Sequence, residues 1–180
     1  MVMREARTLS RDVEVAVIPY GDRITLTMGT VVFVTQALGG SYTAMTDHGY
    51  LVRIEGQDAD AIGETPTRPL SADDLAGKTT EQLAWEQLKT CYDPEIPINI
   101  VDLGLVYRCE VAPQDGGSAV RVELTLTAPG CGMGDFLRQD VQQKLLAIPG
   151  VKEAEVEVVL DPPWDQSMMS DAARLQLGLM

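Results

Sequence analysis

In the second half of the chain, apolar residues recur at two spacings. Helical spacing occurs over 79–93 and 135–148, and strict alternation occurs over 105–111, 120–127 and 153–160. A capping box of Thr79 and Gln82 predicts where the first helix begins, and Pro94 predicts where it ends. The resulting order is αββαβ, which predicts a two-layer domain with both helices on one face of a mixed sheet.

The first 62 residues are β-rich. Short alternating runs separated by glycine-containing turns predict four or five strands, arranged as a small barrel or roll. The stretch 63–78 is rich in proline, glycine and aspartate, lacks periodicity and is interpreted as a linker. We therefore predict an α+β protein with a β domain over 1–62 and an αββαβ domain over 79–180. A final helix is predicted from about Met168 to Leu177, followed by Gly178.

The segment TAPGCGMGD, residues 127–135, separates the second alternating run from the second helical run. Cys131 is therefore predicted just ahead of a helix N-terminus, where free N–H groups and the helix dipole favour a thiolate. The three glycines of the segment let the backbone pass close to a bound group. Two interpretations stay open: a presented, reactive or metal-ligating thiol, or a small buried residue.

Two acids, Asp93 and Glu95, flank Pro94 at the predicted end of the first helix. Carboxylates there oppose the helix dipole, which hints at a function, although solvated surface acids are common. If the hairpin brings this loop beside Cys131, the thiolate, the carboxylates and the Thr127 hydroxyl would share one cleft. Such a donor set suits a thiophilic metal such as iron or zinc.

The other metal-binding residue types have simpler interpretations. Cys109 falls on the apolar side of a predicted strand and is expected in the core. Cys91 falls on the apolar side of the first helix, where core packing is preferred and a minor ligand role stays open. His48, the single histidine, is expected to be an exposed turn residue. No CxxC pair occurs, so neither a zinc ribbon nor a thioredoxin-type redox pair is supported.

Charge and composition exclude several classes of partner. The chain has 180 residues and a net charge of −13, which argues against binding nucleic acid or an anionic membrane surface. No apolar run reaches the length of a membrane span. Three widely spaced cysteines suit a reducing cytoplasm better than a disulfide framework.

Three segments carry a resemblance to a known family. DPEIPINIVDLGLVY (93–107), LTLTAPGCGMGDF (124–136) and DPPWDQSMMSDAARLQLG (161–178) resemble the small cysteine-bearing domain of the SufT family of iron–sulfur assembly accessory proteins. That domain is shared with PaaD, with cytosolic iron–sulfur targeting subunits and with some cluster-carrier ATPases. The segments GTVVFVTQALGGSYTA and GYLVRIEG resemble the N-terminal extension found in SufT.

The resemblance implies a non-enzymatic accessory role in assembling iron–sulfur clusters or delivering them to client proteins. It assigns the metal-binding thiol to Cys131, the acidic loop to Asp93 and Glu95, and the strand-end hydroxyl to Thr127. Many relatives carry a second threonine where this chain has Ala128, so a pair of hydroxyls is not expected. The implied cofactor is iron or an iron–sulfur cluster held transiently, and the implied partners are carrier or scaffold proteins and client apoproteins.

One presented cysteine limits the mechanism, because a 2Fe–2S or 4Fe–4S cluster normally takes four thiolates. Two mechanisms follow: transient ligation shared with a partner or across a homodimer, or a scaffold that binds client and carrier without holding iron. Two rival classes stay open. One is an interaction adaptor in which Cys131 is incidental, and the other is a thiol enzyme, which ranks last because no partnered base is visible.

Overall fold

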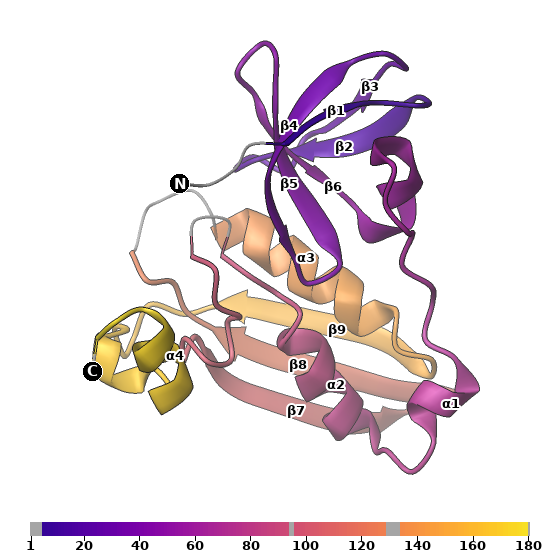
Figure 1. Ribbon diagram of the computed structural model, residues 1–180. Coiled ribbons are helices and arrows are strands. Elements are labelled where there is room, and N and C mark those ends of the chain that lie inside the picture. The colour runs from indigo at the N-terminus through magenta and orange to yellow at the C-terminus, as the bar shows by residue number, and fades with distance from the viewer. Residues whose placement is uncertain (1–4, 94–95, 129–133, 180) are drawn as a thin grey trace. The chain divides into compact units, whose positions relative to one another are not determined.

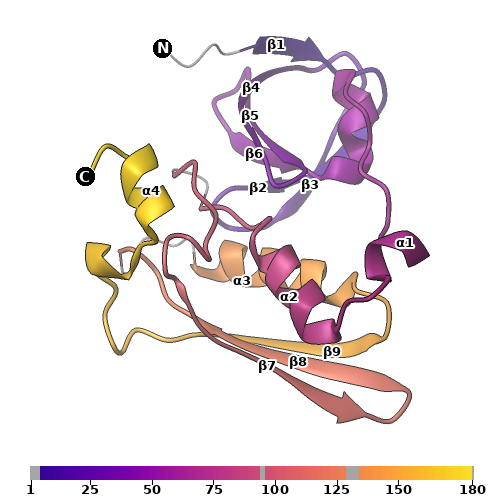
Figure 2. The same cartoon turned by 60° about the horizontal axis from the view of Figure 1, so that its bottom comes forward.

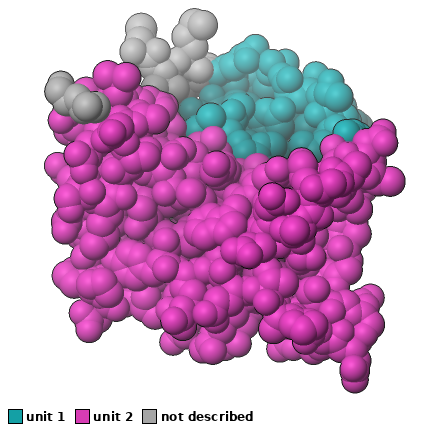
Figure 3. Space-filling view, turned by 90° about the horizontal axis from the view of Figure 1, so that it is seen from below, with its two compact units in different colours: residues 1–68 teal, residues 69–180 magenta. Residues whose placement is uncertain are grey.

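A computed structural model describes residues 5–93, 96–128 and 134–179 (Figure 1). The chain divides into two compact units, Met1–Arg68 and Pro69–Met180, coloured separately in Figure 3. Each unit has its own cluster of buried apolar residues. The protein is therefore α+β, as predicted. The first unit contains an antiparallel sheet, and the second contains a mixed sheet with helices.

The first unit is a six-stranded antiparallel sheet in the order β1-β4-β5-β6-β2-β3. Its strands are β1 (Glu5–Thr8), β2 (Val13–Val17), β3 (Arg23–Leu26), β4 (Val31–Leu38), β5 (Ser41–Thr46) and β6 (Leu51–Ile54). The hairpin predicted around Asp47-His48-Gly49 is confirmed by the β5–β6 ladder. Strand β1 was not predicted, because its sequence EART has no alternating pattern and pairing with β4 defines it.

Buried side chains from one face of the sheet form the core of this unit, with Val15, Val32, Val52 and Ile54 fully buried. The sheet curves around this core (Figure 2). Strands β1 and β3 stand at the two ends of the hydrogen-bonding order, and no ladder joins them among the described residues. The closed-barrel form of the prediction is therefore not confirmed.

A 3-10 helix, η1 (Gly56–Ile62), follows β6 and was not predicted from the sequence. Its Ala59, Ala61 and Ile62 are buried, so the segment contributes apolar residues to the unit. The boundary between the units, after Arg68, falls inside the stretch 63–78 that was interpreted as a linker. That stretch also contains a short helix, α1 (Ala72–Leu75), which begins with a capping box between Ser71 and Asp74.

The second unit follows the order α2 (Thr80–Leu88), β7 (Val106–Gln114), β8 (Gly117–Leu124), α3 (Gly134–Leu146) and β9 (Val151–Val158). Strand β8 is central: it pairs antiparallel with β7 and parallel with β9. Helix α3 makes the crossover between the parallel strands, the connection that such a pair requires. Figures 1 and 2 show α2 and α3 together on one side of the sheet.

The alternation along the strands explains this arrangement. Val120, Val122 and Leu124 of β8 are buried with Leu137, Val141 and Leu145 of α3 in one cluster. The intervening residues, such as Arg121, Glu155 and Glu157, are exposed on the other face. Burying apolar side chains removes roughly 25 cal/mol of unfavourable hydration per Å² of apolar area, so one face of the sheet holds the core and the other faces water.

Two predicted boundaries were wrong. Helix α2 begins at the predicted capping box but ends at Leu88, with Lys89 as its C-cap, well before Pro94. Strand β8 ends at Leu124, and Thr127 lies in a bend beyond it. In both cases the apolar pattern continues past the end of the element. Beyond α2, Cys91 O accepts from Ile100 N, and beyond β8, Thr125 N donates to Leu105 O, so the backbone there bonds to loop 96–105 instead of continuing the helix or the ladder.

The C-terminal segment contains a 3-10 turn, η2 (Gln166–Met168), and helix α4 (Asp171–Gln176). The predicted start at Met168 was wrong, because the Ser170 side chain accepts from Ala173 N and caps the helix there. Gly178, at φ 72°, follows the helix end as predicted. Among the described residues, none of the helices has both the length and the apolar character needed to cross a membrane.

Candidate functional site

Asp93, the first of the two predicted acids, is buried, with only 8% of its surface exposed. It lies beyond the Lys89 C-cap of α2, in the turn that precedes loop 96–105. The interpretation of Asp93 as a solvated surface acid is therefore wrong. A carboxylate that is taken out of water costs free energy unless polar partners compensate, so its place in the fold is more restricted than that of a surface acid.

Thr127 lies half-buried in the bend after β8. Two residues earlier, Thr125 is buried, and its N–H donates to Leu105 O at 2.8 Å. The next described residue after the bend is Ala128, and α3 then begins at Gly134. A Cβ atom on Gly134 would lie 3.1 Å from Leu126 Cδ1, so glycine lets the helix start pack closely against the segment that follows β8.

Loop 96–105 connects the surroundings of Asp93 with those of Thr127. At one end, Ile100 N donates to Cys91 O at 2.9 Å, two residues before Asp93. At the other end, Leu105 O accepts from Thr125 N, two residues before Thr127. The loop buries Ile100, Leu103 and Leu105 completely. One packed loop thus bonds to a residue near each of the two predicted site residues, while the proximity of Asp93 to Thr127 stays a prediction.

Cys131 and Glu95, the predicted thiol and the second predicted acid, lie outside the described residues. The structure places the residues that flank them, Asp93 and Ile96 around Glu95 and Ala128 and Gly134 around Cys131. Helix α3 begins at Gly134, shortly after Cys131, in keeping with a thiol placed ahead of a helix N-terminus. The assignment of Cys131, Asp93, Glu95 and Thr127 to one site therefore remains a hypothesis.

The two described cysteines are core residues. Cys91 is fully buried, and its thiol donates to Gln87 O at 3.6 Å, a bond that requires the protonated sulfur. Cys109 is half-buried on β7, and burial raises the pKa of its thiol to about 11. The core interpretation of both residues is confirmed, because Cys91 belongs to the buried cluster of the second unit and Cys109 packs against that cluster.

Among the described residues, no group of three His, Cys, Asp or Glu side chains is close enough to hold a metal ion. His48 occupies the β5–β6 turn, and its side chain is 79% exposed, as predicted. Its nearest recorded partner is the Asp47 carboxylate, at 3.7 Å. The described part of the chain thus offers no complete metal site built from these residue types.

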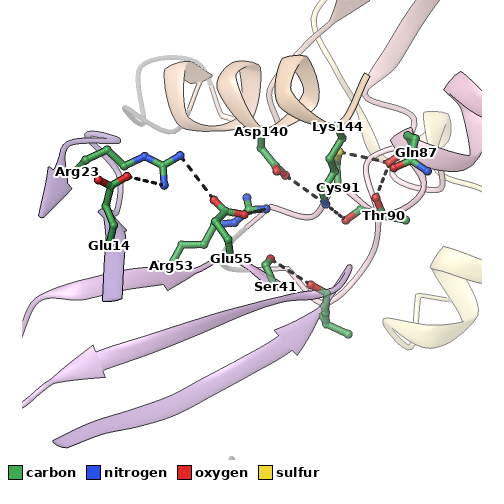
Figure 4. Close-up of polar contacts among 11 residues, drawn as sticks. Glu14, Arg23, Ser41, Arg53, Glu55, Gln87, Thr90, Cys91, Asp140 and Lys144 are labelled. Atoms are coloured by element: carbon green, nitrogen blue, oxygen red, sulfur yellow. Dashed lines mark hydrogen bonds and ion pairs between the residues drawn. The ribbon is translucent and has the colours of Figure 1, made fainter. Parts of the chain in front are cut away.

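A buried ion pair beside this region was missed. Asp140 and Lys144, one turn apart on α3, lie 3.7 Å apart at Oδ2 and Nζ, with side chains only 4% and 17% exposed. The Lys144 ammonium also donates to Thr90 O, just beyond the end of α2 (Figure 4). A cation at the C-terminal carbonyls of a helix is favourable. The bond from Lys144 to Thr90 O joins α3 to the segment that leads to Asp93. In the sequence, the i,i+4 spacing of Asp140 and Lys144 could have indicated the ion pair.

The second unit is thus a small αββαβ domain in which a packed loop follows a buried acid and a glycine-rich segment precedes the crossover helix. A family model described as an iron–sulfur cluster assembly protein matches residues 81–158. The chain is 44% identical over 101 residues to an Fe–S protein maturation auxiliary factor of Porphyromonas gingivalis, which covers 56% of this chain and 93% of that relative. This chain belongs to the iron–sulfur cluster assembly protein family.

Two further relatives show how widely the domain is used. The chain is 42% identical over 87 residues to the Fe–S protein maturation auxiliary factor SufT of Staphylococcus aureus, which covers 48% of this chain and 96% of that protein. It is 34% identical over 70 residues to an iron–sulfur cluster carrier protein of Deinococcus radiodurans, which covers 39% of this chain and only 19% of that protein. The resemblance of the cysteine-bearing domain to the SufT family is confirmed, whereas the resemblance of the first half to an N-terminal extension of SufT stays a prediction.

Proposed function

We propose that this chain acts in the maturation of iron–sulfur proteins by holding iron or a cluster transiently at Cys131. The observation that carries the proposal is the family match over 81–158, because the matched residues include Asp93, Glu95, Thr127 and Cys131. Relatives bear the names of maturation auxiliary factors and of a cluster carrier. The proposed role is binding and delivery in the cytoplasm, not catalysis, with a carrier or scaffold protein and a client apoprotein as partners.

The chemistry of the proposed site is ligand exchange on a cargo metal. A thiolate is a soft ligand that suits iron, and binding of iron to the thiol releases its proton. Helix α3 begins three residues after Cys131, and the dipole at a helix N-terminus favours the thiolate form. Carboxylate oxygens of Asp93 and Glu95 and the hydroxyl of Thr127 would complete or orient the donor set.

The ligand count favours a shared site. A cluster takes four thiolates, whereas Cys91 and Cys109 are packed in the core of the second unit. The remaining ligands would then come from a carrier, from a client or from a second copy of this chain. Incomplete coordination by one chain also favours release, because the client can supply the missing thiolates and take the cargo.

The proposal is tested by anaerobic alkylation of the full chain against pH, with and without ferrous iron. Peptide mass spectrometry separates the three cysteines, so Cys91 and Cys109 serve as internal references. We expect Cys131 to react with a depressed pKa and to be protected by iron. Asp93→Asn should weaken that protection about tenfold or more, while Asp115→Asn, in an exposed hairpin turn, should not.

The alternative is an adaptor that joins carrier and client without binding iron. It is favoured by the net charge of −13, which offers an acidic surface for docking partner proteins. In that case Cys131 reacts with an ordinary pKa, iron gives no protection, and Cys131→Ser retains cluster-enzyme maturation in cells. Loss of maturation in that variant, together with iron protection of the wild-type thiol, would exclude the adaptor.

A further inference from the structure

The segment after β9, residues 161–178, lies along loop 96–105, and we call it the C-terminal strap. Figures 1 and 2 both show its helix α4 beside the loop that leads into β7. The strap is anchored by apolar residues, because Met169 and Ala173 are buried and Trp164 packs against the core cluster of the unit. The strap is thus placed to contact loop 96–105, which bonds to residues near Asp93 and Thr127.

Hydrogen bonds from the strap reach main-chain oxygens along the whole loop. Three donors bind three loop carbonyls: Trp164 Nε1 to Leu103 O at 2.7 Å, Ser170 N to Asp102 O at 2.8 Å, and Gln176 Nε2 to Pro97 O at 3.2 Å. Just beyond the loop, in β7, Tyr107 Oη donates in the opposite direction to Pro162 O of the strap at 2.7 Å. Each loop carbonyl would otherwise need water or another donor, so the strap supplies a large part of the loop's polar contacts.

Close packing accompanies these bonds. Gly104 has φ 77°, and a Cβ atom on it would lie 2.2 Å from Met168 O, closer than any real contact. The backbone of the strap therefore touches the backbone of the loop where a side chain would separate them. Glycine is required here both by the conformation and by the approach.

Loop 96–105 is hydrogen-bonded to the segments that carry both predicted site residues. Its Ile100 N–H binds Cys91 O, near Asp93, and its Leu105 O binds Thr125 N, near Thr127. A shift of the loop would therefore change both of these backbone contacts at once. The strap bonds to loop 96–105, and this loop in turn bonds to Cys91 and Thr125, each two residues from a predicted site residue.

We propose that the C-terminal strap is a positioning element that holds loop 96–105 and thereby fixes Asp93 relative to Thr127. The meaning of those two residues rests on the function proposed above. Trp164, Gly104 and Met168 are the positioning residues, since they make the donor bond and the close backbone contact. The strap thus sets the geometry of the site without contributing a ligand to it.

The test compares two glycine substitutions with the same backbone strain. Gly104→Ala forces the strap from the loop, whereas Gly116→Ala places the same residue at φ 78° with nothing within 4 Å. Trp164→Phe is a milder change that keeps an aromatic ring but removes the donor to Leu103 O. We measure hydrogen exchange of the loop amides, the alkylation rate of Cys131 against pH, and its protection by ferrous iron, all on the full chain.

The positioning role predicts that Gly104→Ala and Trp164→Phe both accelerate exchange of the Leu103 to Leu105 amides and shift the Cys131 alkylation profile. For Trp164→Phe, the loss of one neutral hydrogen bond corresponds to exchange about fivefold faster. Gly116→Ala should change neither readout. If Gly104→Ala does not fold, the comparison of Trp164→Phe with wild type decides.

Two results would overturn the inference. Faster loop exchange with a Cys131 profile equal to that of Gly116→Ala would make the strap a stabilising segment only. Unchanged loop exchange in Trp164→Phe would show that the strap does not hold the loop. Failure of the proposed function gives a different result, because ferrous iron would then not protect Cys131 from alkylation in the wild type. In that case the positioning role of the strap is tested by the pH profile of Cys131 alkylation in the variants.

Discussion

In each unit of the molecule a charged side chain joins a loop residue to a helical segment distant in sequence, but the two ties differ in exposure. In the first unit, Arg11 binds the Asp60 carboxylate through Nε and Nη2 at 2.8 and 2.7 Å, and Asp58 at 2.9 Å. This tie to η1 lies at the surface, with 42% of the Arg11 side chain exposed. In the second unit, Lys144 joins Asp140 and Thr90 O in a largely buried position.

The difference in exposure between the Arg11 and Lys144 contacts affects how much free energy is lost when each contact is removed. An exposed pair gains little net free energy, because water competes for both charges. A buried pair contributes little relative to an apolar pair, yet removal of one partner leaves an uncompensated charge and costs several kcal/mol. The segment that leads to Asp93 is thus held by an interaction that is costly to break, whereas η1 is held by one that is not.

The largest expected effect comes from Lys144→Met, which removes a largely buried ammonium that contacts both the Asp140 carboxylate and Thr90 O. We expect a loss of about 3–5 kcal/mol in the free energy of unfolding, measured by urea denaturation. Arg121→Gln is the matched control, because Arg121 pairs with Glu155 and Glu157 at 3.9 and 3.7 Å while half-exposed, and about 1 kcal/mol or less should be lost there.

The double variant Asp140→Leu with Lys144→Met sharpens this comparison. Replacing both charged residues by apolar ones removes the buried carboxylate together with the cation, so much of the lost stability should return. Equal losses in Lys144→Met and Arg121→Gln would contradict the view that burial separates the two ties.

An intermediate effect is expected at Cys109, which is half-buried. Its folded pKa of about 11 exceeds the ordinary value of 9.0, because burial disfavours the thiolate. Below pH 9 both states keep the proton and the residue has no effect. As pH rises toward 11, the unfolded chain loses its proton first, so the free energy of unfolding falls.

Half-exposure limits the Cys109 effect to about 1 kcal/mol, less than the full shift would give. The measurement is the difference in unfolding free energy between wild type and Cys109→Ala across this alkaline range. That difference cancels the titration of tyrosines and lysines elsewhere. A difference that is flat with pH would show that the Cys109 thiol is not desolvated in the folded state.

Features encoded by neighbouring residues were predictable, and features that depend on distant contacts were not. The capping box of Thr79 and Gln82 and the periodicity that gives α3 were both correctly predicted, because each is local. The end of α2 at Leu88 was missed, since Pro94 was the only stop signal considered and the chain leaves the helix earlier. The bond from Trp164 to Leu103 O joins residues 61 apart, and no local pattern predicts it.

The same distinction applies to the site. Asp93 and Thr127 were singled out from motifs, but the burial of Asp93 and the bonds of loop 96–105 to neighbouring segments depend on tertiary packing. Asp140 and Lys144 had a visible i,i+4 spacing, which is ordinary on solvated helices, so only burial distinguishes them. The roles of Cys131 and Glu95 remain predictions that the alkylation experiment addresses.

The smallest expected effect, Arg11→Gln, tests the exposed tie and its response to pH. The Arg11 guanidinium holds the pKa of the Asp60 carboxyl below its usual 3.8, and the same contacts raise the pKa of Arg11. A lowered folded pKa contributes stability above the unfolded value, and that stability is lost as pH falls through the folded pKa. Arg11→Gln should therefore lower the thermal midpoint slightly at neutral pH, and the difference should vanish in acid. Arg23→Gln, whose carboxylate contacts are longer at 3.9 and 4.0 Å, should show no such pH-dependent difference. A loss from Arg11→Gln that persists in acid would mean that its stem packs η1 against the sheet, and exposure would then not be what separates the two ties.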